Sequence, residues 1–185
     1  MNGMAMSGMA MNGVASPDLA GVLLAILDNG VLWWGLAACG AAQLSKLVVE
    51  LAVHRRWNPK VLFETGGMPS SHSALMTGTT AALGWQLGFD DPLFALAATL
   101  CFVVLYDASG VRRAAGLTAE RVNALVGDAG GLVAGEPPAQ PLKQNLGHTR
   151  LEVLVGSLMG PAVALPGLVW VGTPLHLAQL FSGMA

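Results

Sequence analysis

Apolar residues run along this chain in long stretches that short polar or glycine-rich segments interrupt. A helix needs about 20 apolar residues to cross the roughly 30 Å hydrocarbon core of a bilayer. By this criterion the pattern predicts four membrane-spanning helices, at residues 31–53, 73–89, 93–106 and 151–171. The second and third stretches are short for spans, so we expect thin or tilted packing around them.

The segments outside these spans are short or rich in turn-forming residues. Residues 19–27 are apolar but too short to span, and they predict a short helix that ends at residues 28–30. Residues 90–92, Asp-Asp-Pro, predict a tight turn between the second and third spans. Residues 118–126 predict an amphipathic helix, and residues 127–141 predict a loop rich in glycine and proline.

The composition indicates the same class of protein. Hydrophobic residues make up 54% of the chain and charged residues 11%, whereas soluble domains carry about a quarter charged residues. We therefore predict an all-α, polytopic membrane helical bundle. Residues 29–185 are expected to form a single domain, after a leader and short helix at residues 1–28. The net charge of −2 gives no reason to expect a nucleic-acid partner.

The basic residues fall on one side of this predicted topology. The opposite side carries Asp28, Asp90 and Asp91 and neither lysine nor arginine. Because cytoplasmic segments carry an excess of lysine and arginine, the basic side is predicted to face the cytoplasm. Residues 1–17 lack both types and make a poor signal peptide, which fits a bacterial-type inner membrane. The nine basic residues are Lys46, Arg55, Arg56, Lys60, Arg112, Arg113, Arg121, Lys143 and Arg150.

Residues suited to binding an anion gather at the same predicted face. His72 begins the second span, Asp107 ends the third and His148 begins the fourth. Arginine forks match phosphate oxygens and lysine supplies a compact charge. The helix start at Ser70 and Ser71 adds backbone N–H groups and the positive end of a helix dipole. The further candidates are Arg55, Arg56, Arg112, Arg113 and Lys143, with Gly67 in the preceding turn.

Each of these features also has a purely structural interpretation. Ser70 and Ser71 are typical helix-capping residues, with Pro69 in the first turn. Thr149 and Glu152 have the spacing of a capping box. These interpretations do not exclude a role at an anion site.

The charges near the predicted spans allow two interpretations in the same way. Asp107 can pair with an arginine after the third span, and those arginines can simply mark the cytoplasmic side. Lys46 and Glu50 lie four residues apart within a span and can form a structural ion pair, although charges there are costly. Arg55 follows Lys46 by nine residues, so both reach one site only if the helix ends or bends before Arg55.

Three segments, GGMPSSHSA, YDASGVRRAAG and LKQNLGHTRLEVLVG, carry a family resemblance in this order. Together they resemble the divergent membrane branch of the acid phosphatase and vanadium haloperoxidase superfamily, which includes the type 2 phosphatidic acid phosphatases. The resemblance covers roughly residues 30–171. It implies a helical membrane phosphatase that needs no metal.

The resemblance also implies roles for the two histidines. His148 matches the histidine that attacks phosphorus, and Glu152 replaces the aspartate that orients it. His72 matches the histidine of a Pro-Ser-Gly-His motif that protonates the leaving oxygen, with Ser71 in place of glycine. The residue chemistry agrees, because Glu152 follows His148 by four positions on a helix and can fix one tautomer of its ring.

The phosphate-binding residues of the family are altered in this chain. Lys46 and Arg55 approximate the first motif, a lysine followed by an arginine and a proline, at a longer spacing. The arginine expected six residues before the nucleophile is Leu142, and the adjacent Lys143 is the candidate substitute.

We therefore predict a metal-independent phosphatase without a cofactor, acting on a lipid phosphate or diphosphate presented from the bilayer. One alternative is a metal-dependent phosphohydrolase with His72, His148, Asp107 and Glu152 as ligands, although no compact ligand spacing is present. Another is a non-catalytic anion- or lipid-binding membrane protein or a transporter component. The small-residue spacings Gly84-x3-Gly88 and Gly156-x3-Gly160 would let helices approach closely and allow a homodimer.

Overall fold

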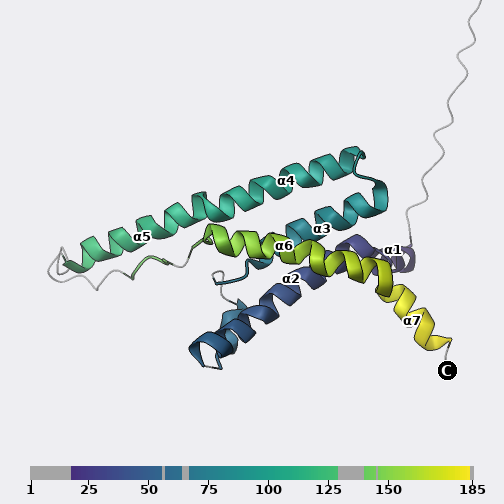
Figure 1. Ribbon diagram of the computed structural model, residues 1–185, viewed down its shortest axis with the longest axis horizontal. Helices are drawn as coiled ribbons and strands as arrows, with labels where there is room; N and C mark the ends of the chain where they lie inside the picture. The colour runs from purple at the N-terminus through teal and green to yellow at the C-terminus, as the bar shows by residue number, and fades with distance from the viewer. Residues whose placement is uncertain (1–17, 56, 64–66, 129–139, 145, 184–185) are drawn as a thin grey trace, which may run out of the picture.

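The described part of the chain consists of helices joined by turns and short loops, as Figure 1 shows. The computed structural model describes residues 18–55, 57–63, 67–128, 140–144 and 146–183. The α-helices are α1 (Leu19–Leu27), α2 (Gly30–Val49), α3 (Ser71–Leu87), α4 (Pro92–Ser109), α5 (Val111–Asp128), α6 (Arg150–Pro166) and α7 (Pro174–Ser182). The π-helical segments η1 (Glu50–His54) and η3 (Gly167–Val171) continue α2 and α6, and η2 (Pro59–Phe63) is a 3-10 helix.

The all-α, polytopic membrane fold is confirmed, and the number of spans differs from the prediction. Three helical runs are long and apolar enough to cross a membrane, Gly30–Val53, Pro92–Val126 and Arg150–Ser182. The predicted second span corresponds to α3, which has 17 residues and is therefore about 26 Å long. The count among the described residues is thus three by length and composition. Helix α3 is short, and it carries small and hydroxyl-bearing residues where the three spans carry large apolar ones.

Two predicted boundaries outside the spans also change. The amphipathic helix expected at residues 118–126 begins earlier and ends later, as α5. The leader at residues 1–17 and residues 129–139 of the predicted loop lie outside the described residues. The domain boundary at residue 28 stays a prediction.

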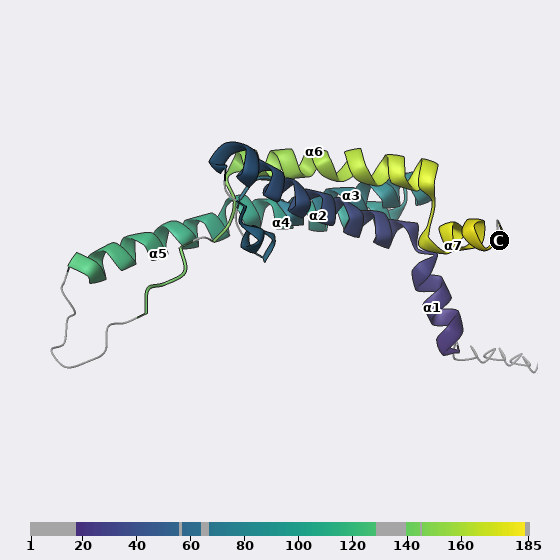
Figure 2. The same ribbon diagram turned by 90° about the horizontal axis from the view of Figure 1, so that it is seen from below.

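Helix α3 lies at the centre of the bundle. It packs against α2, α4 and α6, and α2 also packs against α6. These four helices run in alternating directions along the chain (Figures 1 and 2). The end of α2, the start of α3, the end of α4 and the start of α6 therefore lie toward the same end of the bundle.

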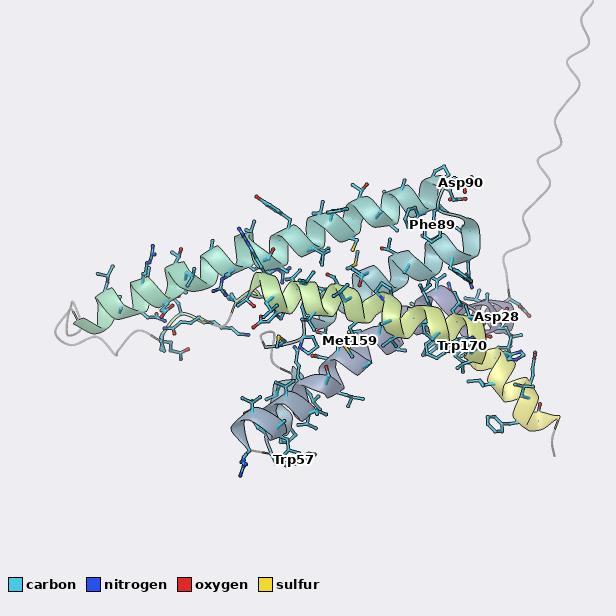
Figure 3. The ribbon with its side chains drawn as sticks, in the orientation of Figure 1. Asp28, Trp57, Phe89, Asp90, Met159 and Trp170 are labelled. Carbon is cyan, nitrogen blue, oxygen red and sulfur yellow. The ribbon has the colours of Figure 1, made fainter. Side chains whose placement is uncertain are left out.

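The opposite end of the bundle carries the acidic turns. Figure 3 shows Asp28 and Asp90 at that end and Trp57 beyond the other end of α2. Asp91 caps α4 by accepting a hydrogen bond from the Leu93 N–H at 2.7 Å, with Pro92 as the first helical residue. The predicted tight turn is confirmed, and the acidic and basic segments lie at opposite ends.

The contact between α3 and α6 depends on two glycines of α6. A Cβ atom on Gly156 would lie 2.3 Å from the carbonyl oxygen of Ser70, and one on Gly160 would lie 2.5 Å from that of Ala74. The predicted close approach is therefore made within the chain. Because α3 already covers Gly156 and Gly160, these glycines are not available for a contact between two copies of the chain. A homodimer stays a prediction, and this pair of glycines does not support it.

Replacing Gly156 with alanine is expected to destabilise the fold by about 1–3 kcal/mol, because the added methyl group must push α6 away from the Ser70 backbone. Gly40→Ala on α2 is the matched control, since among the described residues no heavy atom outside its own stretch of helix lies within 4 Å of its added Cβ. Alanine there is expected to be neutral or to stabilise the helix by up to about 1 kcal/mol. Thermal unfolding in detergent measures both, and equal stability of the two variants would contradict the contact.

Candidate functional site

A cavity of about 280 Å³ lies at the end of the bundle where α3 and α6 begin and α4 ends. Its polar lining combines His72 of α3, Asp107 of α4, Arg112 of α5, and Lys143 and His148 from the segment that precedes α6. The fold thus brings together five predicted site residues from four parts of the chain. The other lining residues are Val103, Val104, Ala108, Leu146 and Gly147.

His148 is held by contacts of both its ring and its backbone. Its Nδ1 lies 3.0 Å from Oε2 of Glu152, and an ionised carboxylate only accepts hydrogen bonds, so Nδ1 carries the proton. When the ring is neutral, Nε2 keeps its lone pair. The His148 backbone N–H donates to the carbonyl oxygen of Ala108 on α4 at 2.9 Å, and only 4% of the residue is exposed. The ring is therefore fixed in orientation, with Nδ1 directed at Glu152.

Glu152 also forms the predicted capping box of α6. The same oxygen, Oε2, accepts the backbone N–H of Thr149 at 3.0 Å, and Thr149 Oγ1 accepts the backbone N–H of Glu152 at 3.2 Å. The capping box is therefore confirmed, and the same oxygen contacts the His148 ring, whereas a chemical role of Glu152 stays a prediction. The N-terminal turn of α6 orients the His148 ring.

Ser70 caps α3, as the structural interpretation predicts. Its Oγ accepts hydrogen bonds from the N–H and the Oγ of Ser73, at 3.3 and 2.8 Å. Its own N–H donates to the carbonyl oxygen of Glu152 at 3.1 Å. Pro69 precedes this cap and does not belong to the first helical turn, because α3 begins at Ser71. Both serines are buried outside the cavity lining, so a phosphate contact from them stays a prediction.

His72 is the second residue of α3 and borders the cavity. It lies outside the three runs that qualify as membrane spans. Partial burial, followed by the nearby charges of His148, Arg112 and Lys46, lowers the pKa of His72 below its usual value of 6.5. The ring is therefore mainly neutral at pH 7, and a bound phosphate dianion would shift its pKa in the opposite direction.

The two cations matched to the first family motif lie apart. Lys46 is in the last turn of α2 and is only 2% exposed. Its charge contributes to the lowered pKa of His72, so it lies near the cavity without lining it. Arg55 follows the end of η1 in a left-handed conformation, with φ 51°, and is exposed. The helix does end before Arg55, but this residue does not line the cavity.

The remaining predicted residues differ in their placement. Asp107 accepts a hydrogen bond from Nε of Arg112, which is the ion pair that the sequence allowed. Arg113 is exposed and lies outside the cavity lining. Gly67 is exposed with φ 87° and likewise lies outside it. Arg56 lies outside the described residues.

Two residues that shape the site were not singled out from the sequence. Gly147 has φ 78°, and a Cβ atom on it would lie 2.4 Å from the backbone nitrogen of Arg113. Asn123 of α5 pairs with Leu142, accepting from its N–H and donating to its carbonyl oxygen, both at 2.8 Å. These contacts hold the segment before α6 against α5 and so position His148. The only available signal was a glycine directly before the histidine.

A metal centre is not evident among the residues the structure describes. Within that part of the chain, no three His, Cys, Asp or Glu side chains lie close enough together to hold a metal ion. The proposed ligand set of the metal-dependent alternative is therefore not assembled there.

The apolar helical bundle defines an integral membrane protein. The sequence matches the divergent PAP2 family over residues 27–163, and the chain belongs to this family. It is also 36% identical over 151 residues to the uncharacterized membrane protein YuiD of Bacillus subtilis (strain 168). This alignment covers 77% of the chain and 96% of the relative. No solved structure matches the chain significantly. Membership confirms the resemblance inferred from the motifs around His72 and His148.

Gly147→Ala is expected to weaken vanadate binding about 10- to 100-fold, because the added methyl group displaces the chain that carries His148 from α5. Gly172→Ala, at φ 84° on the far side of η3, is the matched control for the strain of a positive φ. Vanadate-dependent protection against thermal unfolding measures affinity in both variants. Equal loss of vanadate affinity in both variants would contradict the assigned role of Gly147.

Proposed function

We propose that this protein is a metal-independent membrane phosphatase that hydrolyses a lipid phosphate or diphosphate through a phosphohistidine intermediate. The observation that carries the proposal is the hydrogen bond between Nδ1 of His148 and Glu152, which in the neutral ring leaves the lone pair on Nε2. That ring borders a cavity shared with a second histidine and two cations, His72, Arg112 and Lys143. Family membership supports the same assignment.

In the first step, the lone pair on Nε2 of His148 forms a bond to phosphorus while the phosphorus–oxygen bond to the alcohol breaks. The leaving alkoxide takes a proton from His72. Glu152 stabilises the positive charge that the His148 ring acquires. Arg112 and Lys143 stabilise the charge that develops on the phosphoryl oxygens.

In the second step, water attacks phosphorus and the phosphorus–nitrogen bond breaks, which releases phosphate and restores the lone pair of His148. His72 accepts the proton from water, so each residue ends in its starting state. A low pKa of His72 suits the second step, because a neutral ring can act as a base. The substrate dianion favours the protonated ring needed in the first step.

The position of the cavity supports a lipid substrate. It lies at one end of the apolar bundle, where a headgroup presented from the bilayer arrives. The basic segments share this end, and the positive-inside rule favours a cytoplasmic site in a bacterial-type inner membrane. Residues 29–185 would form the single catalytic domain.

A non-catalytic anion- or lipid-binding role is the second candidate. It is favoured by the placement of Arg55 and Arg113, which lie outside the cavity lining and leave fewer cations there than the motifs suggest. A screen of purified protein against lipid phosphates in the presence of EDTA separates the candidates. The proposed phosphatase releases phosphate under these conditions, a metal-dependent enzyme stops and a binding protein releases none.

The two histidines should respond differently to the leaving group. His148→Ala is expected to abolish turnover of every substrate, because no phosphohistidine can form. His72→Ala should slow a lipid monophosphate about 100- to 10,000-fold, since an alkoxide leaves poorly without a proton. An aryl phosphate, whose nitrophenolate leaves unprotonated, should be affected much less. Glu152→Gln should retain part of the activity, because the amide holds the ring but stabilises its charge poorly.

His176→Ala on α7, at the other end of the bundle, is the matched control for these variants and should keep full activity. Steady-state rates with both substrates decide the assignment. Equal losses for His72→Ala on the two substrates would remove the acid role. An active His148→Ala variant would end the mechanism.

Membrane sidedness is tested by cysteine labelling of whole cells. Asp90→Cys, at the acidic end, should react with an impermeant thiol reagent from outside, and Trp57→Cys, at the basic end, should not. Both positions are exposed in the bundle, with Trp57 at 69%. The native Cys39 and Cys101 are replaced by alanine in both variants. Reversed labelling would place the cavity outside the cytoplasm.

A further inference from the structure

A carboxylate lies among the cations of the cavity. Asp107 borders it together with Arg112, Lys143 and the two histidines. A negative charge beside a phosphate dianion weakens binding through Coulomb repulsion. The proposed mechanism gives Asp107 neither a proton to transfer nor a substrate oxygen to bind. Its presence in an anion site therefore needs an explanation of its own.

The Asp107 carboxylate is paired with the nearest arginine of α5. Nε of Arg112 donates to Oδ2 of Asp107 across the break between α4 and α5 at Gly110. The bond uses one of the five N–H donors of the guanidinium. In the cavity without an anion, the charge of Arg112 is thus balanced by the protein itself.

This ion pair is exposed enough to be displaced. The Arg112 side chain is 64% exposed and that of Asp107 is 36% exposed. Pairs this accessible to water contribute little, because solvent screens them. A phosphate dianion carries a larger charge than a carboxylate and offers an arginine fork two oxygens at once. It is therefore able to compete with Asp107 for the same guanidinium.

The pair is also held at a fixed place relative to the proposed nucleophile. The His148 backbone N–H donates to Ala108, the residue next to Asp107. A Cβ atom on Gly147 would lie 2.7 Å from the carbonyl carbon of Arg112, so the two backbones are in contact. The charge of Arg112 also contributes to the lowered pKa of His72. A change in the partner of Arg112 would therefore alter the electrostatic potential in the cavity.

We propose that Asp107 is a competing carboxylate that pairs with Arg112 in the empty cavity and lowers the affinity for free phosphate. This inference rests on the proposed function, for which it supplies a step of product release. When phosphate leaves, Asp107 takes over its place on Arg112, and the site does not retain its product. Asp107 is in this sense a positioning residue that acts through Arg112.

A simpler interpretation is that the pair only joins α4 to α5 across the helix break. If the pair is only structural, removing the carboxylate lowers stability and changes anion affinity only through direct repulsion, by the same factor with and without Arg112. If Asp107 competes for Arg112, removing it makes anion binding tighter, and most of this effect requires Arg112.

The experiment measures vanadate and inorganic phosphate binding to the full-length protein in detergent by calorimetry. Asp107→Asn is expected to lower both dissociation constants roughly 5- to 20-fold. Glu120→Gln removes the same charge from the exposed surface of α5 and is the matched control, with a change below about twofold. Asp107→Ser repeats the test if the asparagine variant does not fold. Unchanged or weaker binding in the Asp107 variants would overturn the proposal.

A double variant tests whether Asp107 acts through Arg112. In the Arg112→Gln background, Asp107→Asn should tighten binding by a smaller factor than in the wild type, because no guanidinium is released. If Asp107→Asn tightens binding by the same factor in both backgrounds, direct repulsion between Asp107 and the anion explains the whole effect. That result would overturn the competition for Arg112.

The outcome is separable from that of the proposed function. If the wild type hydrolyses lipid phosphate while Asp107→Asn binds phosphate no more tightly, the phosphatase assignment holds and the competition fails. If no phosphate ester is hydrolysed while Asp107→Asn still binds vanadate more tightly, the competition holds and the phosphatase assignment fails. Absence of vanadate binding by the wild type and all variants would overturn the competition whatever the hydrolysis assay shows.

Discussion

The arrangement of this protein depends on the approach of two backbones where α6 crosses the start of α3. Because Gly156 has no Cβ, the carbonyl oxygen of Ser70 lies only 2.3 Å from where that atom would be. At this separation the Ser70 N–H reaches the Glu152 carbonyl oxygen at 3.1 Å. Ser70 is fully buried, and a buried backbone donor without a partner is costly, so this hydrogen bond is strongly favoured. The contact sets the spacing of the two helix starts, and for that reason His72 and His148 border one cavity.

The same helix start couples stability to the proposed chemistry. One oxygen of Glu152 accepts both the Thr149 N–H of the capping box and the Nδ1 proton of His148. The orientation of the histidine is therefore maintained by an interaction that the helix needs for its own N-terminus. Such sharing is consistent with a glutamate in place of the aspartate of the family motif, because a capping box requires the longer side chain at this position.

The electrostatics of the cavity reflect its place at the end of an apolar bundle. Lys46 is buried on α2 and its charge extends to His72, whereas Arg112 reaches the cavity from α5 and is balanced by Asp107. The positive charges near the cavity are thus supplied by several helices and not by one contiguous motif. Arg55, the second residue matched to the first family motif, is exposed after the end of η1 and lies outside the cavity.

The sequence by itself determined the helical class, the ends of most helices, the separation of basic from acidic segments and the local contacts of α6. These features depend on hydropathy, capping residues and i,i+4 spacing, which are properties of neighbouring residues. Only the tertiary structure decided that α3 is the central helix and that Ser70 lies at the α3–α6 junction. It alone placed Arg112 and Lys143 in the cavity and Arg113 outside it. The approach at Gly156 and the positive φ of Gly147 involve residues distant in the chain, and no local pattern encodes which backbone a glycine will meet.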